Sequence, residues 1–447
     1  MQQNTYSRQM WHIAVPAIIT NISVPLLGLV DTFIMGHLPD PRYLGAIALG
    51  AMMISILFNS VNFLRMATTG LTAQAHGRED KTGIPRLYLR AALLALGIGA
   101  LFILIQWPLA QAIFSISKAS SDIEALAAQY FTIRIWGAPF ALLNFAAVGW
   151  LLGLHKAKEA LWVQLLLNVS NICFNILFVY GMGMDVEGVA LGTVLAEFIA
   201  GLFALYLISR HCRRSYSISL WGAGAREDLF DKVAFMKLFA LNRDIFLRTA
   251  CLTGSMAAFT LLGAGMGKQI LAANALLMNI QMITSYGLDG FAQAAEVLVG
   301  KEVGRKSRSG LRTVVIVSSK WALVTAAVFS LVYFLFGNQI INALTNLPDV
   351  RATAEIYLIW VIVLPLISIW CFQFDGIFIG ATAGKYMRNG MVTSTLLYAL
   401  SLYFLLPVWG NHGLWFNYSF FLLMRGVTLA LHYPKIEAAA GHPAAAS

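Results

Sequence analysis

Long apolar stretches alternate with short polar segments along the whole chain. Each stretch has the roughly 20 or more residues that an α-helix needs to cross the hydrocarbon core of a membrane. Six stretches precede a charged segment at 210–236, and six follow it. The twelve predicted membrane helices cover residues 10–36, 45–75, 88–113, 127–154, 160–182, 187–209, 237–264, 270–300, 311–336, 353–380, 388–408 and 412–433.

Composition supports this pattern. Hydrophobic residues make up 59% of the 447 residues and charged residues only 12%, whereas a soluble domain carries about 25% charged residues. A soluble globular protein is therefore excluded, and an all-α integral membrane protein is predicted. The expected organisation is an N-terminal six-helix bundle at 1–209, a cytoplasmic connector at 210–236, a C-terminal bundle at 237–433 and a tail at 434–447. The end of the tail, EAAAGHPAAAS, is expected to be disordered.

The distribution of basic residues predicts the orientation in the membrane. Lys and Arg concentrate in the N-terminal tail, the connector and the loops after even-numbered stretches. The other loops hold only Arg42, Lys118, Lys268 and Arg351. Because basic loops stay in the cytoplasm, both termini are predicted to be cytoplasmic. The net charge of +10 is thereby explained without a nucleic-acid partner.

The two halves of the chain contain an internal repeat. The GR pair at 77–78 recurs at 304–305, and the GxxxG at 149–153 recurs at 376–380, so one constant offset relates both matches. Each half has an even number of predicted spans, so both halves enter the membrane in the same direction. Such repeats are related by a pseudo-two-fold axis along the membrane normal. Two six-helix bundles flanking a central cleft are therefore expected.

Asp31 is an acid inside the first apolar stretch. A carboxylate there is costly, and poor solvation raises its pKa toward a range in which it can exchange protons. The repeat position holds Ala258, so the acid belongs to the first half alone. Pro16 and Pro25 flank the preceding segment and permit a bend. Asp31 is interpreted as a proton-coupling group on a moving helix; a buried acid satisfied by neighbouring groups is the alternative.

Three amides form a stripe in the fifth stretch. Asn168, Asn171 and Asn175 follow one another at helical spacing and share a face. Such a stripe can hydrogen-bond a carboxylate on a neighbouring helix, or it can join helices without a role in transport. We assign Asn171 and Asn175 to the coupling site and Asn168 to substrate binding.

The second half carries its own polar and charged positions within apolar stretches. Asp244 and Arg248 lie one helical turn apart, and their opposite charges suggest mutual neutralisation. The set is interpreted as a structural or gating network, with a second coupling site as the alternative. Further charges inside spans, which the pattern leaves without a role, are Arg65, Arg134, Glu197 and Arg425. The network consists of Asn242, Arg243, Asp244, Arg248, Asp289, Glu296 and Asp375.

Several sequence runs are similar to those of a known transporter family. The runs PLLGLVDTFIMGHL at 25–38, FLRMATTGLTAQAHGR at 63–78, LNRDI at 241–245 and DGIFIGAT at 375–382 resemble the multidrug and toxic compound extrusion (MATE) family, in particular its DinF branch. The resemblance covers residues 8–433. It implies the twelve-helix MATE/MOP fold, and antiport of cationic or amphipathic drugs against protons or Na⁺ across a bacterial inner membrane.

The resemblance also implies roles for single residues. Asp31 matches the aspartate that handles the coupling proton, Asn171 an asparagine hydrogen-bonded near it, and Thr193 a threonine close to the same network. Asn144 matches an asparagine that lines the substrate cavity. Asn175 is a departure, because many relatives have a second aspartate there. The relay of the first half therefore rests on Asp31 alone, or a second proton uses the acids of the second half.

The sequence thus predicts a monomeric secondary exporter of small organic cations, surrounded by lipid and driven by protons through Asp31. Na⁺ coupling within the same fold, and a flippase for lipid-linked precursors, are the alternatives. The four cysteines and eight histidines show no spacing typical of metal ligands or of a nucleophile and its base. No enzyme, metal or cofactor is therefore predicted.

Overall fold

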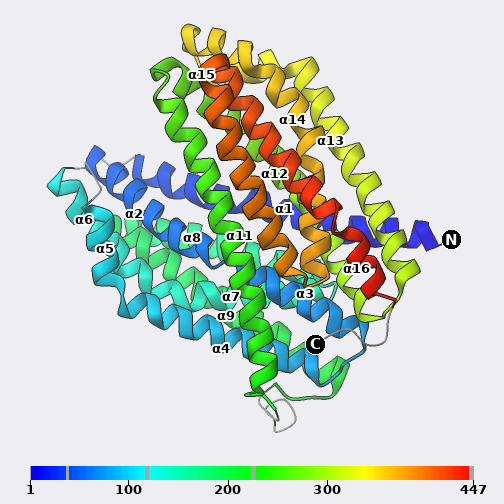
Figure 1. Ribbon diagram of the computed structural model, residues 1–447. Helices are drawn as coiled ribbons and strands as arrows, with labels where there is room; N and C mark the ends of the chain where they lie inside the picture. Colours follow the sequence, from blue (N-terminus) through cyan, green and yellow to red (C-terminus); the bar gives the residue numbers. More distant parts are fainter. Residues whose placement is uncertain (1, 37–39, 116–119, 221, 223–227, 442–447) are drawn as a thin grey trace. The chain divides into compact units, whose positions relative to one another are not determined.

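The computed structural model describes residues 2–36, 40–115, 120–220, 222 and 228–441. Within these ranges, only the backbone is described at residues 2, 24, 26, 27, 29, 31, 32, 35, 36 and 41. All the secondary structure in the described residues is helical (Figure 1). Nine helical segments of this part are long and apolar enough to cross a membrane. The all-α membrane prediction is confirmed.

The chain divides into two units. One unit comprises Met1–Ile18 and Phe239–Ser447, and the other comprises Ile19–Leu238. The segment Met1–Ile18 therefore groups with the C-terminal half, whereas it was expected in the N-terminal bundle. Helix α1 (Gln2–Gly36) runs without a break through this division.

The Ile19–Leu238 unit contains the rest of α1 and shorter helices. Its core includes Met53, Leu64 and Phe131, all less than 2% exposed. Three predicted spans are interrupted, at residues 61–62, at 105 and at 135–137. The elements are α2 (Pro41–Ser60), α3 (Phe63–Gly77), α4 (Gly83–Leu104), α5 (Gln106–Phe114), α6 (Ser121–Arg134), η1 (Ile135–Gly137), α7 (Ala138–Gly153), α8 (Ala157–Asn175), η2 (Ile176–Gly181) and α9 (Val186–Tyr216).

The other unit is built from long helices, of which α12 to α15 pack against one another (Figure 1). The last two predicted spans are joined in one helical element that kinks at Gly410, where φ is +52°. Glycine adopts such a φ without steric cost, so the predicted break appears as a kink. The elements are α11 (Lys232–Ala264, of which the residues up to Leu238 belong to the Ile19–Leu238 unit), α12 (Lys268–Gly304), α13 (Arg308–Leu344), α14 (Pro348–Gly380), α15 (Gly384–Ala430) and α16 (Tyr433–Ala439).

Helices extend beyond the predicted spans at the connector and the tail. Helix α9 continues to Tyr216, and α11 begins at Lys232. Expected disorder from Glu437 onward is wrong for residues 437–439, which belong to α16. Alanine favours helix, Ile436 is buried, and Glu437 forms an ion pair with Arg308 at 3.2 Å. Residues 442–447 lie outside the described part.

The first GxxxG motif brings α7 close to α3. A Cβ at Gly149 would lie 2.5 Å from the carbonyl oxygen of Arg65, and one at Gly153 would lie 2.8 Å from that of Thr69. Real Cβ atoms do not approach backbone oxygens so closely, so only glycine permits this packing.

The second GxxxG motif makes the same contacts in the other unit. Gly376 and Gly380 of α14 face the carbonyl oxygens of Ala292 and Glu296 on α12, with no room for a Cβ. All four positions stand at the repeat offset from their counterparts in the first half. The repeat inferred from the sequence is therefore also a repeat of helix packing.

Two pairs of loops repeat as well. Glu79 and Lys306 have φ of 58° and 56°, and His155 and Thr382 have φ of 62° and 54°. Left-handed φ is uncommon for residues other than glycine, yet both positions recur at the same offset. The loops after the repeated helices thus end those helices in the same way in each half.

Candidate functional site

Helix α1 carries Asp31 and both prolines. Pro16 lies before the division between the units at 18/19, and Pro25 lies after it. A proline in a helix removes one backbone hydrogen bond and favours a bend. The backbone at Asp31 is helical, but the side chain of Asp31 lies outside the described part of the structure.

Helix α8 and its extension η2 run alongside the segment of α1 that contains Asp31. Asn168 Nδ2 donates to the backbone oxygen of Ser23 at 3.2 Å. Further along, in η2, the Tyr180 hydroxyl approaches the backbone oxygen of Ile34 at 3.5 Å. The two contacts bracket Asp31, which places the backbone of this acid alongside the helix of the amide stripe.

The rest of the amide stripe faces α9. Asn171 Nδ2 donates to Thr193 Oγ1 at 2.8 Å, and Asn175 Nδ2 donates to Asn171 Oδ1 at 3.2 Å. Asn171 and Asn175 are fully buried, and a Cβ at Gly192 would collide with Asn175 Oδ1. The predicted association of Asn171, Asn175 and Thr193 is therefore present, as a buried network of neutral groups.

One turn after Thr193, α9 carries a buried ion pair that sequence reasoning left without a role. The two terminal guanidinium nitrogens of Arg134, Nη1 and Nη2, donate to the Glu197 carboxylate at 2.9 and 2.7 Å. Arg134 also stacks over the ring of Phe58, and Asn144 Nδ2 donates to the backbone oxygen of Glu197 at 3.0 Å. The sequence offered one signal, the presence of opposite charges in two apolar stretches, but it did not pair them.

The second half contains a buried charge cluster. Asp375 on α14 accepts from Arg248 on α11 and, at 2.7 Å, from Arg425 on α15. All three residues are buried. Two guanidinium groups therefore contact one carboxylate.

The expected neutralisation of Asp244 by Arg248 within one helix is wrong. Among the described contacts, Asp244 pairs with its neighbour Arg243 at 3.1 Å and with Arg388 on α15 at 2.8 Å, while Arg248 bonds Asp375. Side chains one helical turn apart can meet, but here each of the two charges pairs with a residue on another helix.

The remaining predicted residues of this half have no described contact with these two groups. Asp289 accepts from Gln293, one turn on, at 2.7 Å. Glu296 is buried on α12 at the position where Gly380 of α14 packs. Asn242 is 2% exposed on α11. The predicted set therefore does not form one described network.

An amide pair in the second half was missed by sequence reasoning. Asn274 and Asn411 exchange two side-chain hydrogen bonds, at 2.7 and 2.9 Å, and Trp415 Nε1 donates to Asn274 Oδ1 at 2.9 Å. Asn411 directly follows the kink at Gly410. Asn274 lies within a predicted span and Asn411 in the short gap between the last two predicted spans, so neither position by itself indicated the other.

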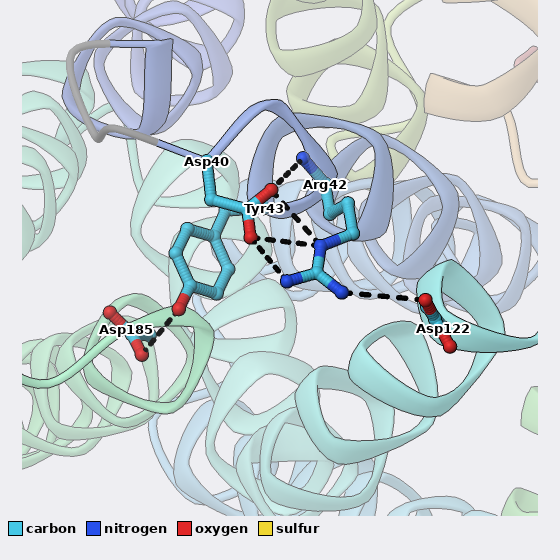
Figure 2. Close-up of polar contacts among 5 residues, drawn as sticks. All are labelled: Asp40, Arg42, Tyr43, Asp122 and Asp185. Atoms are coloured by element: carbon cyan, nitrogen blue, oxygen red, sulfur yellow. Dashed lines mark hydrogen bonds and ion pairs between the residues drawn. The ribbon is translucent and has the colours of Figure 1, made fainter.

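A polar cluster joins the starts of three helices in the Ile19–Leu238 unit (Figure 2). Asp40 accepts from the backbone nitrogen of Arg42 at 2.9 Å and from its guanidinium at 2.6 Å. The same guanidinium reaches Asp122 at 3.3 Å, and the Tyr43 hydroxyl donates to Asp185 at 2.8 Å. Hydrogen bonds from Arg42 lower the pKa of Asp40 below its usual value.

A comparison with protein families gives one match. The MatE family model matches residues 16–177 and 245–404. These two segments make up most of the chain and begin and end at corresponding places in the two repeats. The chain belongs to the MatE family.

Individual MatE relatives agree with this. The chain is 41% identical to DNA damage-inducible protein F of Escherichia coli (strain K12), over 95% of this chain and 91% of that protein. It is 25% identical to a probable multidrug resistance protein NorM of Bacillus cereus, over 78% of this chain and 76% of that protein. The resemblance inferred from the sequence runs, including the DinF branch, is confirmed.

Solved structures share the MatE fold. A crystal structure of MATE in the bent conformation matches with a TM-score of 0.87 at 20% identity, covering 98% of this chain and 97% of that one. An outward-facing MATE transporter of the MOP superfamily matches with a TM-score of 0.85 at 19% identity, over 97% and 96%. The MATE/MOP fold class is confirmed. The chain belongs to a family of membrane transporters, which is not an enzyme family.

Proposed function

We propose that this MATE transporter exports cationic or amphipathic organic compounds in exchange for protons, and that Asp31 carries the proton. The contacts of α8 with α1 on either side of Asp31, at Ser23 and Ile34, carry the proposal. They set the only acid of this stretch of α1 beside a helix whose buried polar groups are neutral amides.

Amides are suitable neighbours for a group that must gain and lose a proton. They can hydrogen-bond either form of a carboxyl group. Three other buried acids have a different environment, because Glu197, Asp244 and Asp375 each form an ion pair with an arginine. A change of charge at any of them would break that ion pair, so these three are better suited to structural roles.

The same arginines favour protons over Na⁺. A hard cation requires several oxygen ligands with excess negative charge. In the second half, Asp375 lies between two guanidinium groups, so cation binding there would meet net positive charge. Na⁺ coupling through this cluster would require both arginines to move away.

The proposed cycle uses the charge of Asp31 twice. When ionised, Asp31 attracts a cationic substrate; when protonated from the outside, it loses that attraction and releases the substrate. A hundredfold difference in affinity corresponds to about 2.8 kcal/mol, and only such a difference can shift a conformational equilibrium. Bending of α1 at Pro16 and Pro25 is the proposed motion, and Asn144 and Asn168 are the proposed substrate contacts. The protein is proposed to act as a monomer in a bacterial inner membrane with both termini cytoplasmic.

The test measures ethidium transport in everted vesicles, with an imposed proton gradient and then an imposed Na⁺ gradient. We compare the wild type with Asp31→Asn and with Asp349→Asn, a matched loss of an exposed carboxylate at the start of α14. Proton-driven transport is expected in the wild type and the control, and is expected to be lost in Asp31→Asn.

Transport that Na⁺ drives, or that survives Asp31→Asn, would refute the proposed coupling and move it to acids of the second half. Flipping of a lipid-linked precursor without ethidium transport would replace the proposal with the flippase alternative.

A further inference from the structure

A charged cavity lies between α4 and the end of the connector in the Ile19–Leu238 unit. It has a volume of about 720 Å³, and its lining includes Arg86, Arg90, Asp228 and Asp231. A second hollow of about 510 Å³ adjoins it, because Phe230 lines both. This second hollow is an apolar groove along α4, lined by Leu93, Leu94, Gly97, Ile98, Leu101, Phe230 and Phe235.

The charged cavity is held in shape by its own residues. Arg90 is 8% exposed, and its guanidinium donates to the backbone oxygens of Leu229 at 2.9 Å and Asp228 at 2.5 Å. Arg86 lies 3.6 Å from the Asp228 carboxylate. Asp231 accepts from backbone nitrogens at the start of α11. Residues 228–229 are thereby held against α4, and the four charges lie around one space.

The two hollows together offer the chemistry that a membrane lipid requires. The cavity has two positive and two negative side chains, so its charge is balanced. The groove beside it lies along an apolar helix, and Phe230 and Phe235, which both line it, stack at 6.3 Å between ring centres. A polar pocket that adjoins an apolar groove suits a headgroup with an attached acyl chain.

We propose that this surface binds a phospholipid with a zwitterionic headgroup that carries a primary amine. The phosphate would lie at Arg86 and Arg90, which suit it through charge-assisted hydrogen bonds. The ammonium would lie at Asp228 and Asp231, and one acyl chain would occupy the groove. A purely anionic headgroup would leave its charge facing two carboxylates, so charge balance favours the zwitterion.

The test is native mass spectrometry of the full-length protein in detergent, titrated separately with phosphatidylethanolamine, phosphatidylglycerol, glycerophosphoethanolamine and inorganic phosphate. No transport is measured, so the result does not depend on the proposed coupling. Phosphatidylethanolamine is expected to bind at least tenfold more tightly than the other three. The two soluble compounds distinguish a lipid site from a site for the free headgroup or for phosphate.

Two variants locate the binding. At Gly97 a Cβ has open space within 4 Å, so Gly97→Leu fills the groove without a clash. It is expected to weaken binding about tenfold, the equivalent of about two displaced methylene groups. Arg86→Gln is expected to weaken it by a similar factor through loss of the charged hydrogen bond.

Gly254→Leu is the matched control, because Gly254 on α11 also has open space and does not line either hollow. It is expected to bind lipid as the wild type does. Equal binding of phosphatidylglycerol, equal binding of the headgroup alone, or unchanged binding in Gly97→Leu would overturn the proposal.

Discussion

The close approach of α7 to α3 leads to a prediction that the structure makes quantitative. In Gly149→Ala the new Cβ would start 2.5 Å from the carbonyl oxygen of Arg65, whereas an ordinary contact begins near 3.4 Å. The new methyl group therefore pushes the two helices apart at this point, and the packing around it is lost. Overpacking of this kind costs about 1–3 kcal/mol.

Gly97→Ala provides the matched comparison. It makes the same chemical change in a membrane helix, but its Cβ meets open space. Alanine favours helix over glycine by up to about 1 kcal/mol, so this variant is expected to be as stable as the wild type or more stable. Because Gly376 occupies the repeated position, Gly376→Ala is expected to behave like Gly149→Ala.

Thermal unfolding in detergent, followed by the fraction of monodisperse protein after heating, measures the effect. The expected order of stability is Gly97→Ala, then wild type, then Gly149→Ala and Gly376→Ala together. If Gly149→Ala unfolds at the same temperature as Gly97→Ala, close backbone contact is not what selects glycine here. If only one of the two GxxxG variants is destabilised, the packing of the two halves is not equivalent.

Three further predictions follow from the polar contacts. Glu197→Ala removes the carboxylate that pairs with the buried Arg134, and is expected to lower the free energy of unfolding by about 3–5 kcal/mol. The double variant Glu197→Leu, Arg134→Met should recover most of that stability in the same unfolding assay. No recovery would contradict the ion-pair explanation. Thr193→Val removes the hydroxyl that accepts a hydrogen bond from Asn171, and is expected to lower the free energy of unfolding by about 1–3 kcal/mol. Thr193→Ser keeps the hydroxyl and should be as stable as the wild type. Equal stability of the two variants would argue against a stabilising role of this hydrogen bond. The pKa of Asp40 is lowered in the folded state. The stability that the Asp40 carboxylate contributes is therefore present above its unfolded pKa of about 3.9 and is lost as pH falls through the folded value. The difference in melting temperature between wild type and Asp40→Asn should shrink from pH 6 toward pH 3, and a constant difference would exclude this linkage.

Much of the fold could be predicted because the membrane restricts it. Every predicted span lies mostly in helix in the described residues, since a chain in hydrocarbon must satisfy its backbone polar groups within each segment. The repeat was also predictable, because glycine at 149 and 376 is required by a contact that both halves share. The internal breaks at 61–62 and 135–137 were not predicted, because each lies between apolar runs that are long enough together to be interpreted as a single span.

The candidate site was predictable only in part. The stripe of Asn171 and Asn175 was visible because amides are costly in apolar helices, and its partner Thr193 came from the family resemblance. Arg134 and Glu197 were visible as charges within apolar stretches, but their pairing across 63 residues was not. Asn274 and Asn411 pair across 137 residues, which local spacing does not reveal.

By itself, the sequence determined which segments are helical and apolar, that the two halves contain a repeat, and where the costly polar groups lie along each stretch. These properties depend on the length, apolarity and spacing of neighbouring residues, which are local. Only the tertiary structure decided which charges neutralise one another, because Asp244 and Arg248 sit one turn apart and still bond to other helices. An unpaired charge is costly when it is buried, so each charged side chain pairs with an opposite charge that is close in space. Spacing along one helix does not reveal which residue that is.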